Sequence, residues 1–285
     1  SALLFLRGTL SFAHIFLLMT ASFGLFSGIE AMGIFSIFSK MTQQSIDRMN
    51  AIKAVPEMQN LSGNLLLDPQ TPHAFDIQFE NVSFAYAEKE VLHNISFSVP
   101  EKTVTALAGL SGSGKTTIVN LLARFWDIEK GRISIGGTDI KELNYENLLH
   151  NISFVFQDVF LFNDTVLNNI RIGRPDATIE EVCEAARRAG CAEFIEAMED
   201  GYDTVIGEAG ARLSGGEKQR ISIARAMMKD SPVIFLDEAT ANVDPENENE
   251  LMHAISSLTK EKTVILIAHR LKSVSKANQI LVLDH

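Results

Sequence analysis

The stretch Gly109-Leu-Ser-Gly-Ser-Gly-Lys-Thr116 decides the fold class, because it matches the pattern G-x-x-x-x-G-K-[ST] in full. An apolar run over 103–108 precedes it and predicts a strand, and apolar residues at helical spacing over 118–122 follow it. The stretch therefore has the strand–loop–helix context of a phosphate-binding loop, which a chance glycine-rich turn would lack. The glycines let backbone N–H groups face phosphate, and the helix N-terminus adds positive charge. We expect Lys115 to reach the β- and γ-phosphates and Thr116 to bind Mg²⁺.

A second buried strand is predicted over Val233-Ile-Phe-Leu, and it ends in the acids Asp237 and Glu238. In company with a phosphate loop, Asp237 is placed to hold the Mg²⁺ shell and Glu238 to act as general base toward water. A further apolar strand over 263–268 leads to His269. Because ligands bind at the carboxyl ends of parallel strands, we expect His269 to contact the γ-phosphate.

The segment Leu213-Ser-Gly-Gly-Glu-Lys-Gln-Arg220 predicts the start of a helix. Ser214 and Glu217 have the spacing of a capping box. The glycines at 215 and 216 leave the helix start open to the close approach of an anion. Taken alone, the segment could also be a capped helix and nothing more.

The N-terminal region predicts a membrane span. Residues 8–29 contain no Asp, Glu, Lys or Arg, and 22 residues of helix extend about 33 Å, enough to cross a hydrocarbon core. The apolar character resumes after Glu30, so we expect a span over about 8–38 with a helical extension into the cytosol. A buried core helix is usually shorter, and a signal peptide would have a basic segment first. Three basic residues follow the span and one precedes it, which places residue 40 onward in the cytosol.

A single span cannot form a pathway through a bilayer, so this helix is expected to belong to a bundle whose other helices are missing from the chain. Glu30 would be costly facing lipid, and we expect it to face other helices or a wet cavity.

Composition excludes several classes of protein. The chain has 25 Lys+Arg and 36 Asp+Glu, a net charge of −11, which argues against nucleic acid as a partner. Residues 1–72 carry four basic and four acidic residues, so the whole net charge lies in 73–285. A hydrophobic content of 46% excludes general disorder. Cys183 and Cys191 are too few for a disulfide scaffold and are expected to be reduced.

Three regions follow along the chain. Residues 1–54 are the expected end of a helical membrane domain, and the proline-containing stretch 55–75 reads as a linker. Alternating apolar residues over 77–84 and 95–99 then predict a small antiparallel sheet. A capping box at Thr178 and Glu181 opens an expected helical stretch over 179–199.

Over about residues 76–284, the order of these motifs resembles an ATP-binding cassette (ABC) ATPase. The resemblance implies an α/β P-loop fold. Its parts are a mixed, parallel core sheet, a small antiparallel β subdomain and a helical subdomain over about 143–229. The span and linker before the cassette resemble exporter-type half-transporters. The family usually continues beyond the strand at 280–284, so the C-terminus is also expected to be cut.

The resemblance assigns further residues. It places Tyr86 on adenine, Gln157 in the Mg²⁺-sensing Q-loop, and Asp244 in the D-loop. The implied ATP-binding residues are Tyr86, Gly109, Ser111, Gly112, Ser113, Gly114, Lys115, Thr116, Thr117 and Gln157. Those implied to bind the partner's ATP are Leu213, Ser214, Gly215, Gly216 and Glu217. Thr116, Gln157 and Asp237 would hold Mg²⁺, and Glu238 and His269 would be catalytic.

The sequence departs from the family pattern at three positions. Glu217 stands where Gln is frequent, and Ala241 stands where the D-loop often has Ser. Ala209, in a segment resembling the exporter X-loop, replaces the usual Arg, so a cross-domain salt bridge there is in doubt.

By resemblance, two cassettes sandwich ATP, so the expected partner is a second half-transporter, identical or different. The expected function is ATP-driven export of a lipid, drug or peptide-like substrate across the inner or plasma membrane, with membrane lipid around the span. The alternatives are an importer of metal–siderophore complexes with an exporter fold, a non-transport cassette ATPase, and a regulatory cassette that binds ATP only.

Overall fold

The computed structural model describes residues 11–54, 63–87, 89–237, 245–268 and 277–284. The chain divides into two compact units, Ser1–Gln59 and Asn60–His285. The catalytic candidates Glu238 and His269 and the D-loop residue Asp244 lie outside the described residues.

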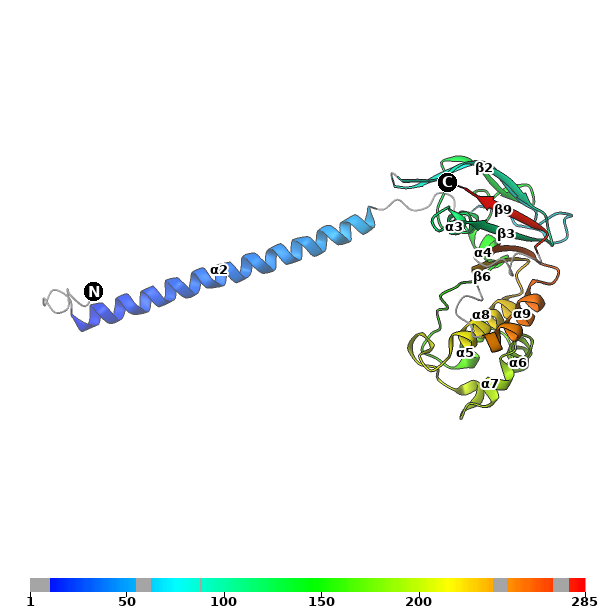
Figure 1. Cartoon of the computed structure of the whole chain (residues 1–285). Coiled ribbons are helices and arrows are strands. Elements are labelled where there is room, and N and C mark those ends of the chain that lie inside the picture. The colour runs from blue at the N-terminus through cyan, green and yellow to red at the C-terminus, as the bar shows by residue number, and fades with distance from the viewer. Residues whose placement is uncertain (1–10, 55–62, 88, 238–244, 269–276, 285) are drawn as a thin grey trace. The chain divides into compact units, whose positions relative to one another are not determined.

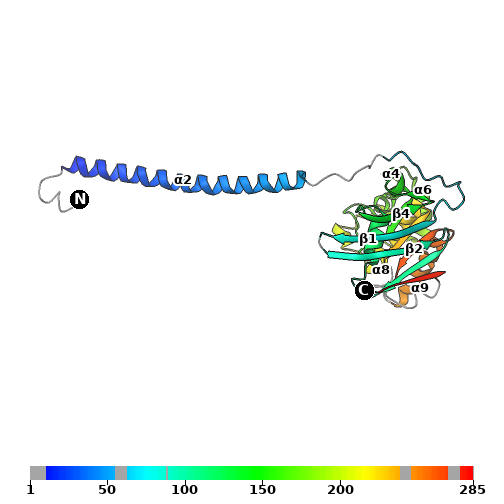
Figure 2. The same ribbon diagram turned by 90° about the horizontal axis from the view of Figure 1, so that it is seen from above.

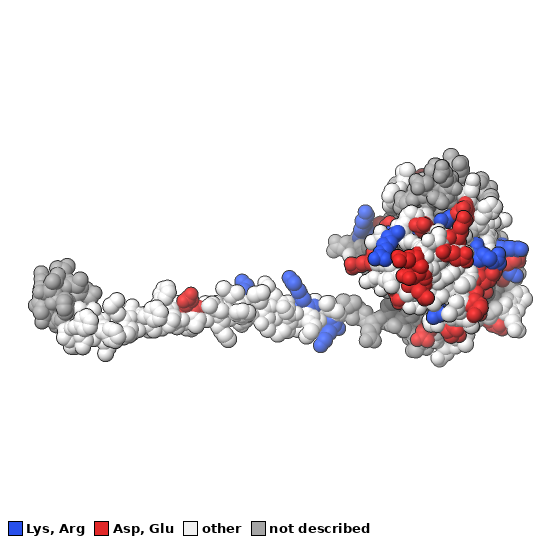
Figure 3. All heavy atoms as spheres, turned by 90° about the horizontal axis from the view of Figure 1, so that it is seen from below, with Lys and Arg blue, Asp and Glu red and all other residues white. Residues whose placement is uncertain are grey.

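The first unit is one continuous helix, α2 (Phe12–Lys53), of 42 residues. No residue of α2 is buried within the structure, although most of its side chains are apolar. The helix is long and apolar enough to cross a membrane. It continues without a break past Ser39, as the predicted extension requires, and its basic residues gather toward its C-terminal end (Figure 3).

The second unit contains the predicted antiparallel sheet. Its strands are β1 (Ile77–Tyr86), β2 (Lys89–Val99), β4 (Lys130–Ile135) and β5 (Thr138–Asp139), in the order β2-β1-β4-β5. The antiparallel pairing of β1 with both β2 and β4 is visible in Figure 2. Side chains of β1 alternate between buried and exposed near its start, because one face of the sheet packs on the core.

A second sheet carries the motifs. Its strands are β3 (Val104–Gly109), β6 (Ile152–Val155), β7 (Val233–Asp237), β8 (Thr263–Ile267) and β9 (Gln279–Leu283). Their order is β6-β7-β8-β3-β9, and every pairing within it is parallel. The described strands of the core sheet, which was expected to be mixed, are therefore all parallel. The antiparallel pairings belong to the other sheet. Helix α3 (Lys115–Leu122) lies in the hydrophobic core between the two sheets.

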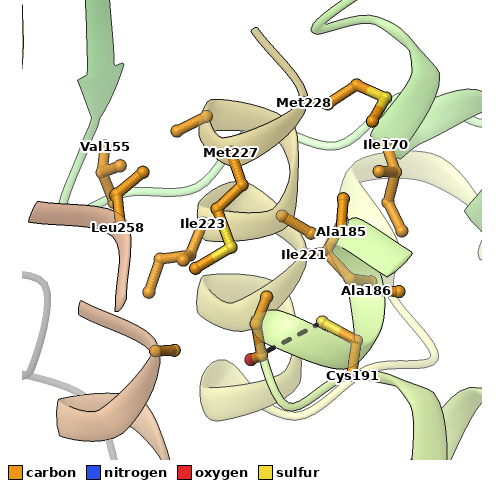
Figure 4. Packing of buried hydrophobic residues seen from close by; sticks show 14 of the residues in the cluster. Val155, Ile170, Ala185, Ala186, Cys191, Ile221, Ile223, Met227, Met228 and Leu258 are labelled. Atoms are coloured by element: carbon orange, nitrogen blue, oxygen red, sulfur yellow. Dashed lines mark hydrogen bonds between the residues drawn. The ribbon is translucent and has the colours of Figure 1, made fainter. Parts of the chain in front are cut away.

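The helical part of the second unit gathers around one long helix (Figure 1). Its elements are α5 (Val166–Arg171), α6 (Ile179–Arg188), α7 (Ala192–Glu196), the 3₁₀ turns η1 (Gly201–Asp203) and η2 (Glu208–Gly210), α8 (Gly215–Lys229) and α9 (Pro245–Thr259). Helix α4 (Tyr145–His150) lies instead beside β6, with Leu148 in the core of the sheets. Helix α8 is central: Ile223 and Met227 point toward Leu258, and Met228 lies near Ile170 on another side (Figure 4).

The expected helical stretch over 179–199 consists of two helices, α6 and α7, with a break between them. Helix α6 ends at Arg188, and Gly190 adopts a left-handed conformation with φ of 70°. The N–H of Cys191 returns to the carbonyl of Ala186 at 2.7 Å, which closes the helix end. The glycine thus acts as a stop signal, and the chain restarts as α7.

Candidate nucleotide-binding site

The loop between β3 and α3 depends on glycine at both of its ends. Gly109 has a φ of 148°, and a Cβ atom there would lie 2.4 Å from the carbonyl oxygen of Leu283 on the neighbouring strand. Gly114 has a φ of 93°, and a Cβ atom there would lie 2.6 Å from a side-chain carbon of Leu92. Neither position accommodates a side chain without movement. The backbone can therefore turn tightly between the sheet and the helix.

The start of α3 is open to an anion. Helices α4, α5, α6 and α8 each begin at a residue whose side chain caps a backbone N–H group. Helix α3 begins after Gly114, which has no side chain to cap with. The N–H groups of its first turn therefore remain available to an external acceptor, and the helix dipole favours a negative one.

Lys115 lies folded over this loop. Its side chain is only 5% exposed, and its Nζ donates hydrogen bonds to the carbonyls of Gly109 at 3.0 Å and Leu110 at 2.7 Å. A third contact, at 3.4 Å, goes to the Oγ of Ser113. Among the described residues, the hydrogen-bond partners of this buried ammonium are neutral oxygens. The ammonium is therefore well placed to gain from a phosphate oxygen, because a charge-assisted hydrogen bond is stronger.

Two of the three predicted Mg²⁺ ligands meet at one cavity. Thr116 at the start of α3 and Asp237 at the end of β7 both line a space of about 20 Å³, together with Phe156 and Ile267. Most of the residues that line this space are apolar, so the space itself is not a cage for an ion. The fit to Mg²⁺ rests on the two side chains alone, because a hydroxyl and a carboxylate are oxygen donors of the kind that the ion prefers. The third predicted ligand, Gln157, is exposed and follows Phe156 directly.

The two catalytic candidates, Glu238 and His269, come shortly after the ends of the neighbouring strands β7 and β8. Asp237 pairs with Ile267 across β7 and β8, both at the carboxyl ends of their strands. Glu238 comes one residue after Asp237, and His269 comes two residues after Ile267. The positions of both candidates stay a sequence prediction.

The capping box predicted at the 213–217 segment is confirmed. The Oγ of Ser214 accepts a hydrogen bond from the Glu217 N–H at 3.3 Å, and the Glu217 carboxylate accepts one from the Ser214 N–H at 2.8 Å. Leu213 and Gly216 are buried, whereas Ser214 and Gly215 are exposed at the tip of α8. No hydrogen bond joins this tip to residues 109–117 in the described part of the chain.

Comparison with known proteins decides the family. The family model "ABC transporter" matches residues 92–241, more than half of the chain. The chain belongs to the ABC transporter family. This membership and the fold described above confirm the resemblance inferred from the motifs.

Several named transporters resemble this ABC transporter chain. An "ATP-dependent lipid A-core flippase" of Haemophilus influenzae (strain 86-028NP) is 51% identical over 212 residues, covering 73% of this chain and 36% of that protein. A "Putative multidrug export ATP-binding/permease protein YgaD" of Bacillus subtilis (strain 168) is 44% identical over 211 residues, covering 73% of this chain and 36% of that protein. The chain thus spans about a third of the length of these relatives.

A solved structure extends the match into the first unit. A structure titled "Structure of a bacterial Atm1-family ABC exporter with ATP bound" aligns with a TM-score of 0.73 and 37% sequence identity. It covers 92% of this chain and 46% of that exporter chain. The second unit, Asn60–His285, makes up less than 92% of the chain. An alignment that covers 92% of the chain must therefore also include residues of the first unit.

Two residues of α8 that sequence reasoning missed connect this helix to the Q-loop segment. Gln219 is buried, and its Nε2 donates a hydrogen bond to the carbonyl of Phe156 at 3.2 Å. Arg225 donates to the carbonyl of Phe160 at 3.1 Å and to that of Asn169 at 3.0 Å. Burial lowers the pKa of the Arg225 guanidinium, yet the group stays charged at neutral pH. Their only signal in the sequence was a polar side chain within a helix rich in buried apolar residues.

Proposed function

We propose that this chain is the ATP-hydrolysing part of an exporter-type half-transporter, in which ATP binding and hydrolysis by a pair of cassettes drive a substrate across a membrane. The observation that carries the proposal is the phosphate-binding loop: a buried lysine and an uncapped helix N-terminus lie beside Thr116 and Asp237, which share one cavity. We place the end of the membrane domain at 1–54, the linker at 55–75 and the cassette at 76–285.

In the proposed complex, the triphosphate lies along residues 109–117. Lys115 exchanges its carbonyl partners for β- and γ-phosphate oxygens, and the N–H groups of α3 donate to the phosphates. Thr116, Gln157 and Asp237 would hold Mg²⁺, which would neutralise negative charge on the phosphates. Tyr86, at the end of β1, stacks on adenine.

Hydrolysis requires a base beside the γ-phosphate. Glu238 accepts a proton from the attacking water, and His269 contacts the γ-phosphate from the neighbouring strand. Both residues follow strands whose carboxyl ends meet at one edge of the sheet. The proposal of turnover, and not of ATP binding alone, rests on this complete set of side chains.

A second cassette completes the site. Leu213, Ser214, Gly215, Gly216 and Glu217 begin α8 in the helical part, and in the described chain no hydrogen bond links them to 109–117. This separation is consistent with a site composed of two chains, in which each gives its α8 tip to the partner's ATP. Asp244 would lie at the same interface. The partner is a second half-transporter, and no nucleic acid is expected.

The direction of transport is proposed to be outward. The named relatives include a lipid A-core flippase and a multidrug export protein, which favours export of a lipid or drug over import of a metal chelate. Helix α2, which has no buried residue and is long and apolar enough to cross a membrane, favours a membrane protein over a non-transport ATPase. Lipid and other helices would cover it, and the basic residues near its end support a cytosolic location for the cassette.

Phosphate release by the full-length transporter in membranes tests the proposal. Glu238→Gln should abolish steady-state release while ATP still binds, and Lys115→Ala should abolish ATP binding itself. Unchanged turnover in Glu238→Gln would show that Glu238 is not the base. Uptake into inverted vesicles, compared with uptake by whole cells, separates export from import.

A further inference from the structure

Three aromatic side chains meet at the end of β1. The ring of Tyr86 lies 4.8 Å from that of Phe84 and 5.2 Å from that of Trp126, with interplanar angles of 90° and 88°. Phe84 and Trp126 are themselves 6.3 Å apart at 62°. Both contacts of Tyr86 are edge-to-face, an arrangement that aromatic rings favour. Among the described residues, no ring lies parallel to Tyr86, which leaves a parallel stack to an external ring.

Trp126 is held firmly by the loop that follows α3. Arg124 has a left-handed backbone with φ of 54°, and its guanidinium is buried. The Arg124 Nε lies 2.9 Å from a carboxylate oxygen of Asp127. This ion pair joins the residues on either side of Phe125 and Trp126. The N–H of Phe125 also donates to the Asn120 carbonyl of α3 at 2.9 Å. The indole is therefore carried on a fixed backbone.

The Tyr86 ring lies beside the turn of the β1–β2 hairpin. Tyr86 is the last residue of β1 and pairs with Lys89, directly beside the turn that joins β1 to β2. Its side chain is half-buried. Tyr86 packs against the hydrophobic core, and among the described residues Phe84 and Trp126 are the aromatic rings in contact with it, so these two rings set the orientation of the phenol.

The surroundings of Trp126 argue against direct contact with a nucleotide. Trp126 is 51% exposed and lines a cavity of about 420 Å³. The charged side chains of that cavity are three carboxylates, Glu90, Asp127 and Glu129, and one ammonium, Lys130. A triphosphate would meet a net negative lining there. Among the described residues, the contact with Tyr86 is then the direct link from Trp126 to the expected base-binding residue.

We propose that Trp126 is a positioning residue for nucleotide binding: it holds the Tyr86 ring in the orientation that stacks on the base, without touching the nucleotide itself. The proposal rests on the proposed ATP-binding function and on Tyr86 as the base-stacking residue. Its consequence is specific. Loss of the indole weakens recognition of the base and leaves recognition of the phosphates unchanged.

The test compares two ligands that share phosphates but differ in the base. Binding of ATP and of inorganic tripolyphosphate to the full chain is measured by calorimetry without Mg²⁺, so that no turnover occurs. Trp126→Leu should weaken ATP binding about two- to tenfold, the effect of one aromatic pair, and should not change tripolyphosphate binding. Trp126→Phe, which keeps a ring, should restore ATP affinity to within about twofold of the wild-type chain.

The control variant is Phe162→Leu. Phe162 is 50% exposed and forms an edge-to-face pair with Phe160 at 5.1 Å and 88°, so it matches Trp126 in exposure and geometry away from Tyr86. Phe162→Leu should bind both ligands like the wild-type chain. Tyr86→Ala should weaken ATP binding at least about fivefold, because a stacked base is lost.

The outcomes separate the two proposals. If Tyr86→Ala binds ATP normally, the base-stacking assignment of Tyr86 is wrong, and the positioning role falls with it. If Tyr86→Ala weakens ATP binding and Trp126→Leu does not, the positioning role alone is overturned. If Trp126→Leu weakens ATP and tripolyphosphate equally, the indole supports the phosphate loop, and the positioning role is again overturned.

Discussion

Replacing Arg220 by Ala should destabilise the cassette by about 2–3 kcal/mol, whereas replacing its partner Glu250 by Gln should cost about 1 kcal/mol or less. Arg220 lies on α8, six residues after Ser214, and forms an ion pair with Glu250 on α9. Its guanidinium also lies 5.2 Å from the centre of the Phe194 ring on α7. One side chain thus joins three helices of the helical part.

The difference between the two variants follows from burial. The Arg220 side chain is 7% exposed and that of Glu250 is 57% exposed. Loss of Arg220 removes a charge-assisted hydrogen bond, about 1.5–3 kcal/mol, and a cation–π contact, about 1 kcal/mol. It also removes a buried Nε without a hydrogen-bond partner among the described residues, which returns about 1 kcal/mol. Glu250→Gln keeps an acceptor oxygen, and water screens the lost charge.

Urea unfolding of the full chain measures these values, with the fluorescence of Trp126, the one tryptophan of the sequence, as the signal. Arg220→Met, which keeps the buried volume, should fall between the two other variants. Arg187→Ala is the control, because Arg187 pairs with Glu184 on the surface and its loss should leave the midpoint unchanged. A Glu250→Gln variant as unstable as Arg220→Ala would refute the argument from burial.

Three further predictions concern the site and its support. Gln219→Leu removes the donor of the 3.2 Å hydrogen bond to the Phe156 carbonyl. The full-length transporter should lose about two- to tenfold in ATP turnover while the cassette stays folded. Unchanged turnover would show that this hydrogen bond does not support the Q-loop. Gly114→Ala should weaken ATP binding at least about tenfold, because φ is 93° and the new Cβ would lie 2.6 Å from a side-chain carbon of Leu92. Calorimetry measures the affinity, and a wild-type value would contradict the steric argument. Burial raises the pKa of Cys191 to about 12 from an ordinary value near 9, so the unfolded chain loses this proton first and the free energy of unfolding should fall as pH rises above about 9. Urea unfolding of Cys191→Ala should lack this part of the decline, and an equal decline in both chains would rule out Cys191 as its source.

Local patterns in the sequence were sufficient where the interactions are local. The capping boxes at Thr178 and Ser214 were predicted from spacing alone, and both are present, because each depends on residues within one helical turn. The apolar strand 233–236 is buried on the parallel sheet for a similar reason: its pattern reports burial on both faces.

The end of α6 was less predictable. A single glycine inside a helical pattern is compatible with either a continuous helix or a stop. The left-handed turn at Gly190 became definite only with the packing of Cys191 into the core beside α8 (Figure 4).

By itself, the sequence determined the family, the phosphate-binding loop and the apolar N-terminal helix, since each is encoded by consecutive residues with fixed spacing. Only the tertiary structure decided which distant residues act together. Tyr86 and Trp126 are 40 positions apart, and Gln219 and Phe156 are 63 apart, yet each pair is in contact. Sheet order and helix packing set those contacts, and a pattern read along one segment does not contain them.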